Sequence, residues 1–431
     1  MLKRKSNKEV AARGYWCSVS LSGVFGILFL ISGWYMKNQP FLTNLMNALG
    51  KFVLLIFTVC LLFGFLKWVI SYRLLKYGLK RSIWAARTIR EINRQLGDAQ
   101  IGVVHNDILK LPRLKFRFTQ DQFLVQIKNS IKYNDKFKNF DISAALSGYV
   151  VESSYFSDDR RWLFFECTDA SSNFGYSFES LTSFEKTVEC IGDYDVLIDK
   201  RLTYRLHHSL IVGQTGSGKS YALYSFVLQG LIKGWQMAIV DPKNASMANI
   251  GELVGESATS KQEIIELLDK FFLAMTRRKK ELKEKLKMGL DKDYSAFGLK
   301  PHILLFDEFA SFQSQLKSEK KDTRDKVQGQ IEAIILEGRQ LGFFVILAMQ
   351  KSDATIVNTL IRDNLVFKCV LGSSEQQTYI TTFGNADIPQ QKMGIGKGVY
   401  TLSGITNKPR ILNMPELKFD LYEAFKELVR R

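Results

Sequence analysis

The chain has 431 residues, of which 46% are hydrophobic, and it carries a formal net charge of +17. This length suits two or three domains, and the excess of lysine and arginine indicates nucleic acid or anionic lipid as a partner, or simply charged membrane flanks and solvated helices. The cysteines form no C-x-x-C pair and only four histidines are present, which argues against a structural zinc site.

Two apolar stretches near the N-terminus predict a membrane hairpin. A basic segment, residues 1–17, precedes the uncharged run 18–36, and a second run, 52–72, contains only Lys67 near its end. Each run is long enough to cross a bilayer as a helix. We therefore expect a two-helix transmembrane hairpin over residues 18–72. A cleaved signal peptide is disfavoured because the first run is long and a second follows at once. A buried helical hairpin of a soluble domain is the other alternative.

The distribution of lysine and arginine predicts the orientation of this hairpin. Residues 73–99 are rich in both, whereas the loop between the apolar runs carries only its two flanking lysines. The positive-inside rule then places both termini and everything after the hairpin in the cytoplasm. We expect residues 73–99 to form a basic juxtamembrane helix that lies on anionic headgroups or in solvent.

A small α+β module is predicted over residues 100–195. Segments 116–127, 148–156 and 162–167 are typical of strands because apolar residues alternate with polar ones or cluster in short runs. No catalytic constellation is apparent in this region, so a spacer or an assembly surface are the interpretations it allows.

Residues 196–431 are predicted to form an α/β P-loop motor domain. The stretch from Leu210 to Ser220 fits G-x-x-x-x-G-K-[ST] between a strand-like run and a helix-length apolar segment, a context that disfavours a chance glycine turn. Backbone N–H groups of such a loop bind phosphates, its lysine reaches the β- and γ-phosphates, and its hydroxyl holds Mg²⁺. The predicted nucleotide-binding residues are Gly213, Gln214, Thr215, Gly216, Ser217, Gly218, Lys219 and Ser220.

A second motif follows in the stretch from His302 to Glu308, where four apolar residues precede two acids. A buried strand of this kind brings Asp307 to the carboxyl edge of a parallel sheet, where nucleotides bind. We expect Asp307 to hold Mg²⁺ through water and Glu308 to polarise the attacking water. The strand 237–241 lies between the two motifs in the chain, which suits the class of ATPases with an additional strand and a catalytic glutamate.

Three further residues are candidates for catalysis. Gln350 ends the apolar strand 342–349, where it could sense the γ-phosphate or be an ordinary strand-end amide. Arg339 and Arg362 are each candidates for an arginine finger reaching the nucleotide of a neighbouring subunit, or for a surface or salt-bridge residue. The glycine-dense segment 394–398 precedes a strand rather than a helix, and we expect it to be a tight turn leading into a hairpin with residues 409–412.

These segments resemble the FtsK/SpoIIIE family of hexameric DNA-pumping ATPases. The resemblance covers roughly residues 195–415. The phosphate loop alone is shared by many ATPases, and the later segments, in their order along the chain, make the resemblance specific to this family. The segments that carry it are 208–220, 241–243, 303–308 and 338–350, extended by 358–364 and the turn at 394–398.

Two apolar runs before the motor, and a chain that stops at Arg431 without a winged-helix DNA reader, make the layout similar to FtsK-type coupling proteins of Gram-positive conjugative plasmids and integrative conjugative elements. The resemblance implies a RecA-like ATPase that uses ATP and Mg²⁺, assembles as a homo-hexamer and moves single-stranded DNA regardless of sequence. It also implies a relaxase and a type IV secretion channel as partners. Chromosome segregation at division and a nucleotide-switched membrane scaffold are the alternatives.

Overall fold

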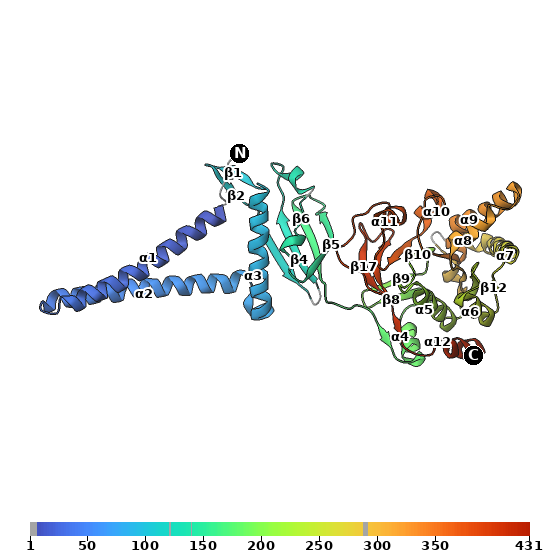
Figure 1. Cartoon of the computed structure of the whole chain (residues 1–431), viewed down its shortest axis with the longest axis horizontal. Coiled ribbons are helices and arrows are strands. Elements are labelled where there is room, and N and C mark those ends of the chain that lie inside the picture. Colours follow the sequence, from blue (N-terminus) through green and yellow to red (C-terminus); the bar gives the residue numbers. More distant parts are fainter. Residues whose placement is uncertain (1–6, 120–121, 139, 288–291) are drawn as a thin grey trace. The chain divides into compact units, whose positions relative to one another are not determined.

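The computed structural model describes residues 7–119, 122–138, 140–287 and 292–431 (Figure 1). The chain divides into two compact units between Ala170 and Ser171. The first unit contains the long apolar helices and a small sheet, and the second contains a large mixed sheet with its covering helices.

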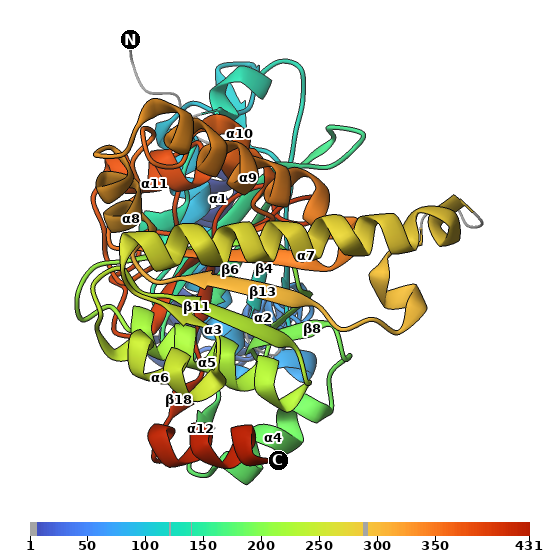
Figure 2. The same ribbon diagram turned by 90° about the vertical axis from the view of Figure 1, so that its right-hand side faces the viewer.

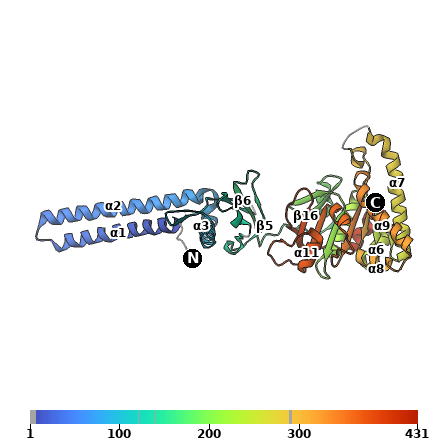
Figure 3. The same ribbon diagram turned by 90° about the horizontal axis from the view of Figure 1, so that it is seen from above.

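Two long helices, α1 (Asn7–Tyr35) and α2 (Pro40–Ser71), lie side by side as a hairpin (Figures 1 and 3). They approach closely where Gly50 faces Leu30, because a Cβ on Gly50 would lie 2.9 Å from the leucine side chain. Their outer faces are apolar, with Phe63 64% and Ile70 75% exposed. Both helices are long and apolar enough to cross a membrane.

The second of these helices begins earlier than the apolar run 52–72 suggests. Pro40 stands in its first turn, where the missing N–H of proline costs no hydrogen bond. The polar residues of the first turns are compatible with a helix although they dilute the hydropathy of the stretch. The helix therefore extends well beyond the predicted segment, to a total of 32 residues.

The remainder of the first unit is an α+β structure. The helix α3 (Leu74–Asp98) packs its buried residues, among them Ala85 and Ile92, against a four-stranded antiparallel sheet. That buried stripe lies in the core of the unit, so only the opposite face of the basic helix is available to solvent or headgroups. The sheet has the order β3 (Leu114–Phe118), β4 (Gln122–Lys128), β6 (Trp162–Asp169), β5 (Tyr149–Phe156), and a short hairpin precedes it, β1 (Val103–His105) and β2 (Ile108–Lys110).

Residues 171–195 belong to the second compact unit, although the sequence predicts that they belong to the preceding module. Strand β7 (Ser177–Phe178) pairs in parallel with β18 (Glu416–Leu417) near the C-terminus. Helix α4 (Leu181–Glu189) buries Phe184 and Val188 in the core of the second unit. The second compact unit therefore begins at Ser171, whereas the sequence predicts a boundary at residue 196. Local sequence does not reveal the pairing with a distant strand.

The second unit is built on an eight-stranded sheet of order β12-β11-β13-β14-β10-β15-β16-β17. In this spatial order, all neighbouring strands from β12 at one edge through β11, β13, β14 and β10 to β15 are parallel. Strands β16 and β17 extend the sheet in antiparallel pairing. Their bounds are β10 (Ser209–Gly213), β11 (Gln236–Val240), β12 (Ser257–Ala258), β13 (His302–Phe306), β14 (Phe343–Met349), β15 (Phe367–Leu371), β16 (Lys397–Leu402) and β17 (Arg410–Asn413).

One additional strand, β14, lies between β10 and β13, the strands that precede the two nucleotide motifs. Strand β11, which lies between those motifs in the chain, is on the far side of β13 instead. Every residue of β10 and β14 is buried, as expected of strands covered on both faces. The turn at 394–398 leads into the β16–β17 hairpin, and that prediction is confirmed.

Helices cover both faces of this sheet (Figure 2). On one face α7 (Lys261–Lys287) lies beside α9 (Lys321–Leu341), and its Phe271 packs edge to face against Phe343 of β14 with ring centroids 5.2 Å apart. On the other face lie α5 (Lys219–Ile232) and α6 (Ser246–Val254), whose buried residues share a core with α12 (Leu421–Arg430). The other α-helices and strands of this unit are β8 (Asp195–Asp199), β9 (Leu202–Arg205), α8 (Phe309–Leu316), α10 (Thr359–Asn364) and α11 (Gln376–Phe383).

Candidate active site

The glycine-rich loop connects β10 to α5 at the carboxyl edge of the parallel strands. Gly218 has φ of +95°, a conformation that strains residues with a Cβ. A Cβ at this position would also lie 2.8 Å from the backbone N of Gly396. The loop residues Gln214, Thr215 and Gly216 are exposed, so their backbone is accessible to a ligand at the start of α5.

The turn at 394–398 supports this loop from behind. The N–H of Gly396 donates to the carbonyl of Ser217 at 2.9 Å, and the Gly396 carbonyl accepts from the N–H of Met414 at 2.7 Å. The sequence predicts this turn as the start of a hairpin but does not predict its contact with the phosphate loop. Its glycine density is the signal that another backbone approaches closely.

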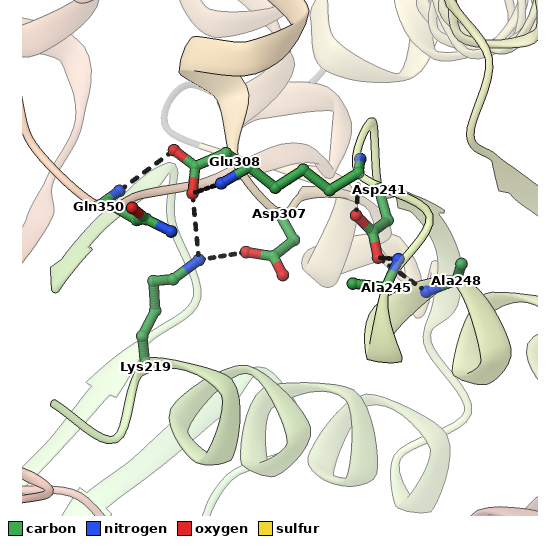
Figure 4. A network of polar contacts seen from close by, with 8 residues as sticks. Lys219, Asp241, Ala245, Ala248, Asp307, Glu308 and Gln350 are labelled. Carbon is green, nitrogen blue, oxygen red and sulfur yellow. Dashed lines mark hydrogen bonds and ion pairs between the residues drawn. The ribbon is translucent and has the colours of Figure 1, made fainter. Parts of the chain in front are cut away.

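The acidic pair lies beside the loop (Figure 4). Strand β13 ends at Phe306, and the N–H of Asp307 donates to the carbonyl of Val240 at 2.8 Å, which extends the pairing with β11 by one step. The Lys219 ammonium forms an ion pair with Asp307 and lies 4.0 Å from Oε2 of Glu308. The structure thus brings together three residues predicted for the site, from two motifs distant in sequence.

Glu308 has an unusual backbone and two close partners. Its φ is +64°, in the left-handed region that non-glycine residues rarely adopt, and its side chain is 8% exposed. Oε1 accepts from the backbone N–H of Gln350 at 3.3 Å, and Oε2 lies 3.1 Å from Nζ of Lys243. The contact with Gln350 is made by its main chain, rather than by the side-chain amide considered as a sensor.

Lys243 is a functional candidate that the sequence did not identify. It belongs to the Asp-Pro-Lys segment that follows β11, at the edge of the sheet that also carries Asp307. Asp241 is buried and accepts backbone N–H groups from Lys243 at 3.1 Å, Ala245 at 2.8 Å and Ala248 at 3.1 Å (Figure 4). These bonds satisfy donors at the start of α6 and fix the turn from which Lys243 extends.

A cavity of about 480 Å³ adjoins the loop. Gly218 and Tyr221 line it on one side, and Tyr176, Met414 and Lys418 are among the residues that line it elsewhere. A base-sized group attached to a phosphate in the loop would fit a cavity of this size, which is within the usual range of ligand sites.

The donors present suit a hydrated Mg²⁺ ion better than a tightly coordinated metal. Within the described residues, no group of three or more His, Cys, Asp or Glu side chains could hold a metal ion. Ser220, the second residue of α5, and Asp307 provide one hydroxyl and one carboxylate. Mg²⁺ commonly binds in this way, with one or two protein ligands, phosphate oxygens and water.

The two candidate arginines lie at the opposite edge of the sheet. Arg339 closes α9 before β14 begins, and Arg362 lies in α10 before β15 begins. Arg362 forms an ion pair with Asp363 at 3.1 Å, whereas Arg339 is exposed in an open cavity of about 1080 Å³ lined by several lysines. Neither residue is brought to the phosphate loop of its own chain.

Known proteins resemble this chain in sequence and in fold. Residues 188–300 match the FtsK/SpoIIIE family. The Ftsk domain-containing protein YdcQ of Bacillus subtilis (strain 168) is 31% identical over 184 residues, which cover 42% of this chain and 38% of that protein. The type VII secretion system protein EssC of Staphylococcus aureus (strain NCTC 8325 / PS 47) is 28% identical over 207 residues, covering 42% of this chain and 13% of EssC. The chain thus spans much less than two thirds of either relative.

Among solved structures, the pCW3 conjugation coupling protein TcpA, in a monomer form with ATPγS, matches with a TM-score of 0.52 at 18% identity. The match covers 80% of this chain and 99% of TcpA. The resemblance to the FtsK/SpoIIIE family predicted from the motifs is confirmed, and the motor has the α/β fold of an FtsK-type P-loop ATPase.

Proposed function

We propose that this FtsK-type P-loop ATPase is a membrane-anchored, ATP-driven DNA translocase. It acts as a conjugative coupling protein that delivers relaxase-bound, single-stranded DNA to a type IV secretion channel. The observation that carries the proposal is the convergence of Lys219, Asp307 and Glu308 beside a glycine-rich loop at one sheet edge. The fold shared with a conjugation coupling protein supports the biological role.

ATP binds with its phosphates in the loop from Gly213 to Ser220 and its base in the adjoining cavity. Lys219 exchanges its ion pair with Asp307 for the β- and γ-phosphates. Ser220 and Asp307 would hold Mg²⁺, which would neutralise charge on the transferred phosphoryl group.

Glu308 acts as the general base for the attacking water. Its carboxylate is almost fully buried beside Lys219, so it is near the γ-phosphate position that the lysine reaches. A nucleotide-operated switch without turnover would not require this carboxylate, which favours hydrolysis over the scaffold alternative. Gln350 lies beside Glu308 and contributes its backbone N–H.

The active unit is a homo-hexamer in which one subunit completes the site of the next. Arg339 and Arg362 lie at the sheet edge opposite their own phosphate loop, so only a neighbouring copy could bring either to the nucleotide. Arg339 is the stronger candidate because it is exposed and Arg362 is paired with Asp363.

The two long apolar helices anchor the motor in the membrane lipid, with both termini in the cytoplasm. Sequence-independent contacts to the phosphate backbone suit a chain with an excess of basic residues. Recognition of a particular DNA would then fall to the relaxase.

The test is the ATPase activity of the full chain in detergent, with and without DNA. We expect single-stranded DNA to raise the rate more than duplex DNA does. We expect Lys219→Ala to abolish ATP binding, and Glu308→Gln to keep binding but lose turnover by at least about 100-fold. A rate that DNA leaves unchanged would contradict translocation, and stimulation by duplex alone would favour chromosome segregation.

A further inference from the structure

The Asp-Pro-Lys segment provides a cation whose place in the site is not explained by phosphate binding. Lys243 reaches Glu308 from β11, whereas Lys219 approaches the same carboxylate from α5. The two ammonium groups differ in what else they contact. Lys219 also forms an ion pair with Asp307, whereas Lys243 forms an ion pair with Glu308, with Nζ 3.1 Å from Oε2.

Nucleotide binding changes the charge balance around Glu308. Lys219 has to leave the acidic pair when it reaches the phosphates, and the phosphates bring further negative charge. Glu308 is nearly buried, and a buried carboxylate without a positive partner is costly. Lys243 is the remaining cation within 4 Å of Glu308 among the described residues.

The geometry also restricts the orientation of Glu308. Its two oxygens are held separately, Oε1 by the N–H of Gln350 and Oε2 by Lys243. Its backbone is in the left-handed region, which persists only when surrounding contacts enforce it. The backbone N–H of Lys243 is in turn fixed by Asp241 at 3.1 Å, so the lysine extends from a rigid turn.

We propose that Lys243 is a positioning residue for hydrolysis, which holds the carboxylate of Glu308 aimed at the attacking water once Lys219 has moved to the phosphates. The inference rests on the proposed function, because it assumes that Glu308 is the general base. Lys243 acts through Glu308 and does not bind the nucleotide.

The test uses the full chain in detergent and compares Lys243→Met with Lys243→Arg. Methionine keeps most of the unbranched side chain and removes the charge, so we expect kcat to fall roughly 10- to 100-fold, as for a misplaced catalytic group. The affinity for ATP and the KM should remain within about threefold. Arginine restores a cation, and we expect it to recover most of kcat.

Lys326→Met is the matched control, because Lys326 is similarly exposed and forms an ion pair with Asp269 at 2.8 Å, outside the site. Its kcat should equal that of the wild type. Thermal unfolding of each variant with ATPγS establishes that the site remains folded.

A double variant separates a positioning role from an independent one. In a Glu308→Gln background, Lys243→Met should lower the residual rate no further, since the group through which it acts is gone. An additional loss there, a reduced ATP affinity, or an unchanged or raised kcat in the single variant would each overturn the proposal. Retained turnover in Glu308→Gln alone would instead overturn the proposed role of Glu308.

Discussion

Gly218 illustrates how one residue connects the phosphate loop to the rest of the motor. Its φ of +95° allows the loop to curl before α5 begins, and its missing side chain admits the backbone of Gly396. These are separate requirements, one conformational and one steric, and only glycine meets both.

Gly218→Ala should therefore impair ATP binding as well as stability. The left-handed conformation costs alanine about 1–2 kcal/mol, and the contact with Gly396 forces the loop or the turn to shift. The measurement is ATP affinity together with thermal unfolding. Gly234→Ala is the control, because Gly234 has φ of +65° and open space around a Cβ. If both variants lose stability equally and both bind ATP normally, the steric part of this interpretation is wrong.

A buried histidine, His208, directly precedes strand β10, and we expect it to make the second unit sensitive to acid. Nδ1 of His208 accepts a hydrogen bond from the N–H of Val345 at 3.0 Å. This buried bond links the residue before β10 to strand β14. Burial is the main cause that lowers the pKa of His208 from 6.5 to about 3. The pKa values of His207 and His302 at the same sheet edge are lowered to about 4, also mainly by burial.

We expect the free energy of unfolding to fall as the pH drops below about 6.5. The folded state keeps His208 neutral while the unfolded state takes up a proton, so stability decreases by about 1.4 kcal/mol per pH unit for this residue. Urea unfolding of the full chain at pH 7.5 and pH 5.5 measures the slope. His208→Asn, which keeps an acceptor for Val345, should flatten it, and an unaltered slope would contradict the assignment.

The apolar hairpin α1–α2 predicts that the whole protein stays in the membrane fraction. Apolar side chains such as Phe63 and Ile70 are exposed along helices long enough to cross a bilayer. An apolar surface of this size is unfavourable in water and marks a membrane or protein interaction site. We expect the full chain to remain in the membrane pellet after alkaline carbonate extraction. Removal of residues 1–72 should move it to the supernatant, and a full chain released by carbonate would contradict membrane insertion.

Sharing of sites between subunits can be tested by mixing two inactive variants. Arg339→Ala lacks the proposed finger but has an intact Glu308, and Glu308→Gln has the reverse. If Arg339 acts on a neighbouring site, mixed assemblies contain some complete sites, and the mixture should recover ATPase activity that neither variant shows alone. No recovery, with assembly verified by light scattering, would exclude a shared site that uses Arg339.

The sequence predicts those parts of the site that depend on local pattern. Residues 213–220 and the pair Asp307–Glu308 are recognisable because loop, strand end and helix start are consecutive in the chain. The position of β14 between β10 and β13, the approach of Lys243 and the pairing of β7 with β18 depend on long-range packing. Such contacts join residues far apart in sequence, so no local period or motif reveals them.

The support behind the phosphate loop has a mechanical consequence. Ser217 is hydrogen-bonded to Gly396, Gly396 to Met414, and two residues later the N–H of Glu416 donates to the carbonyl of Tyr176 at 2.9 Å. This series of hydrogen bonds connects the loop to the segment by which the chain enters the second compact unit, which begins at Ser171. We therefore expect a ligand that displaces the loop to shift this entry segment as well.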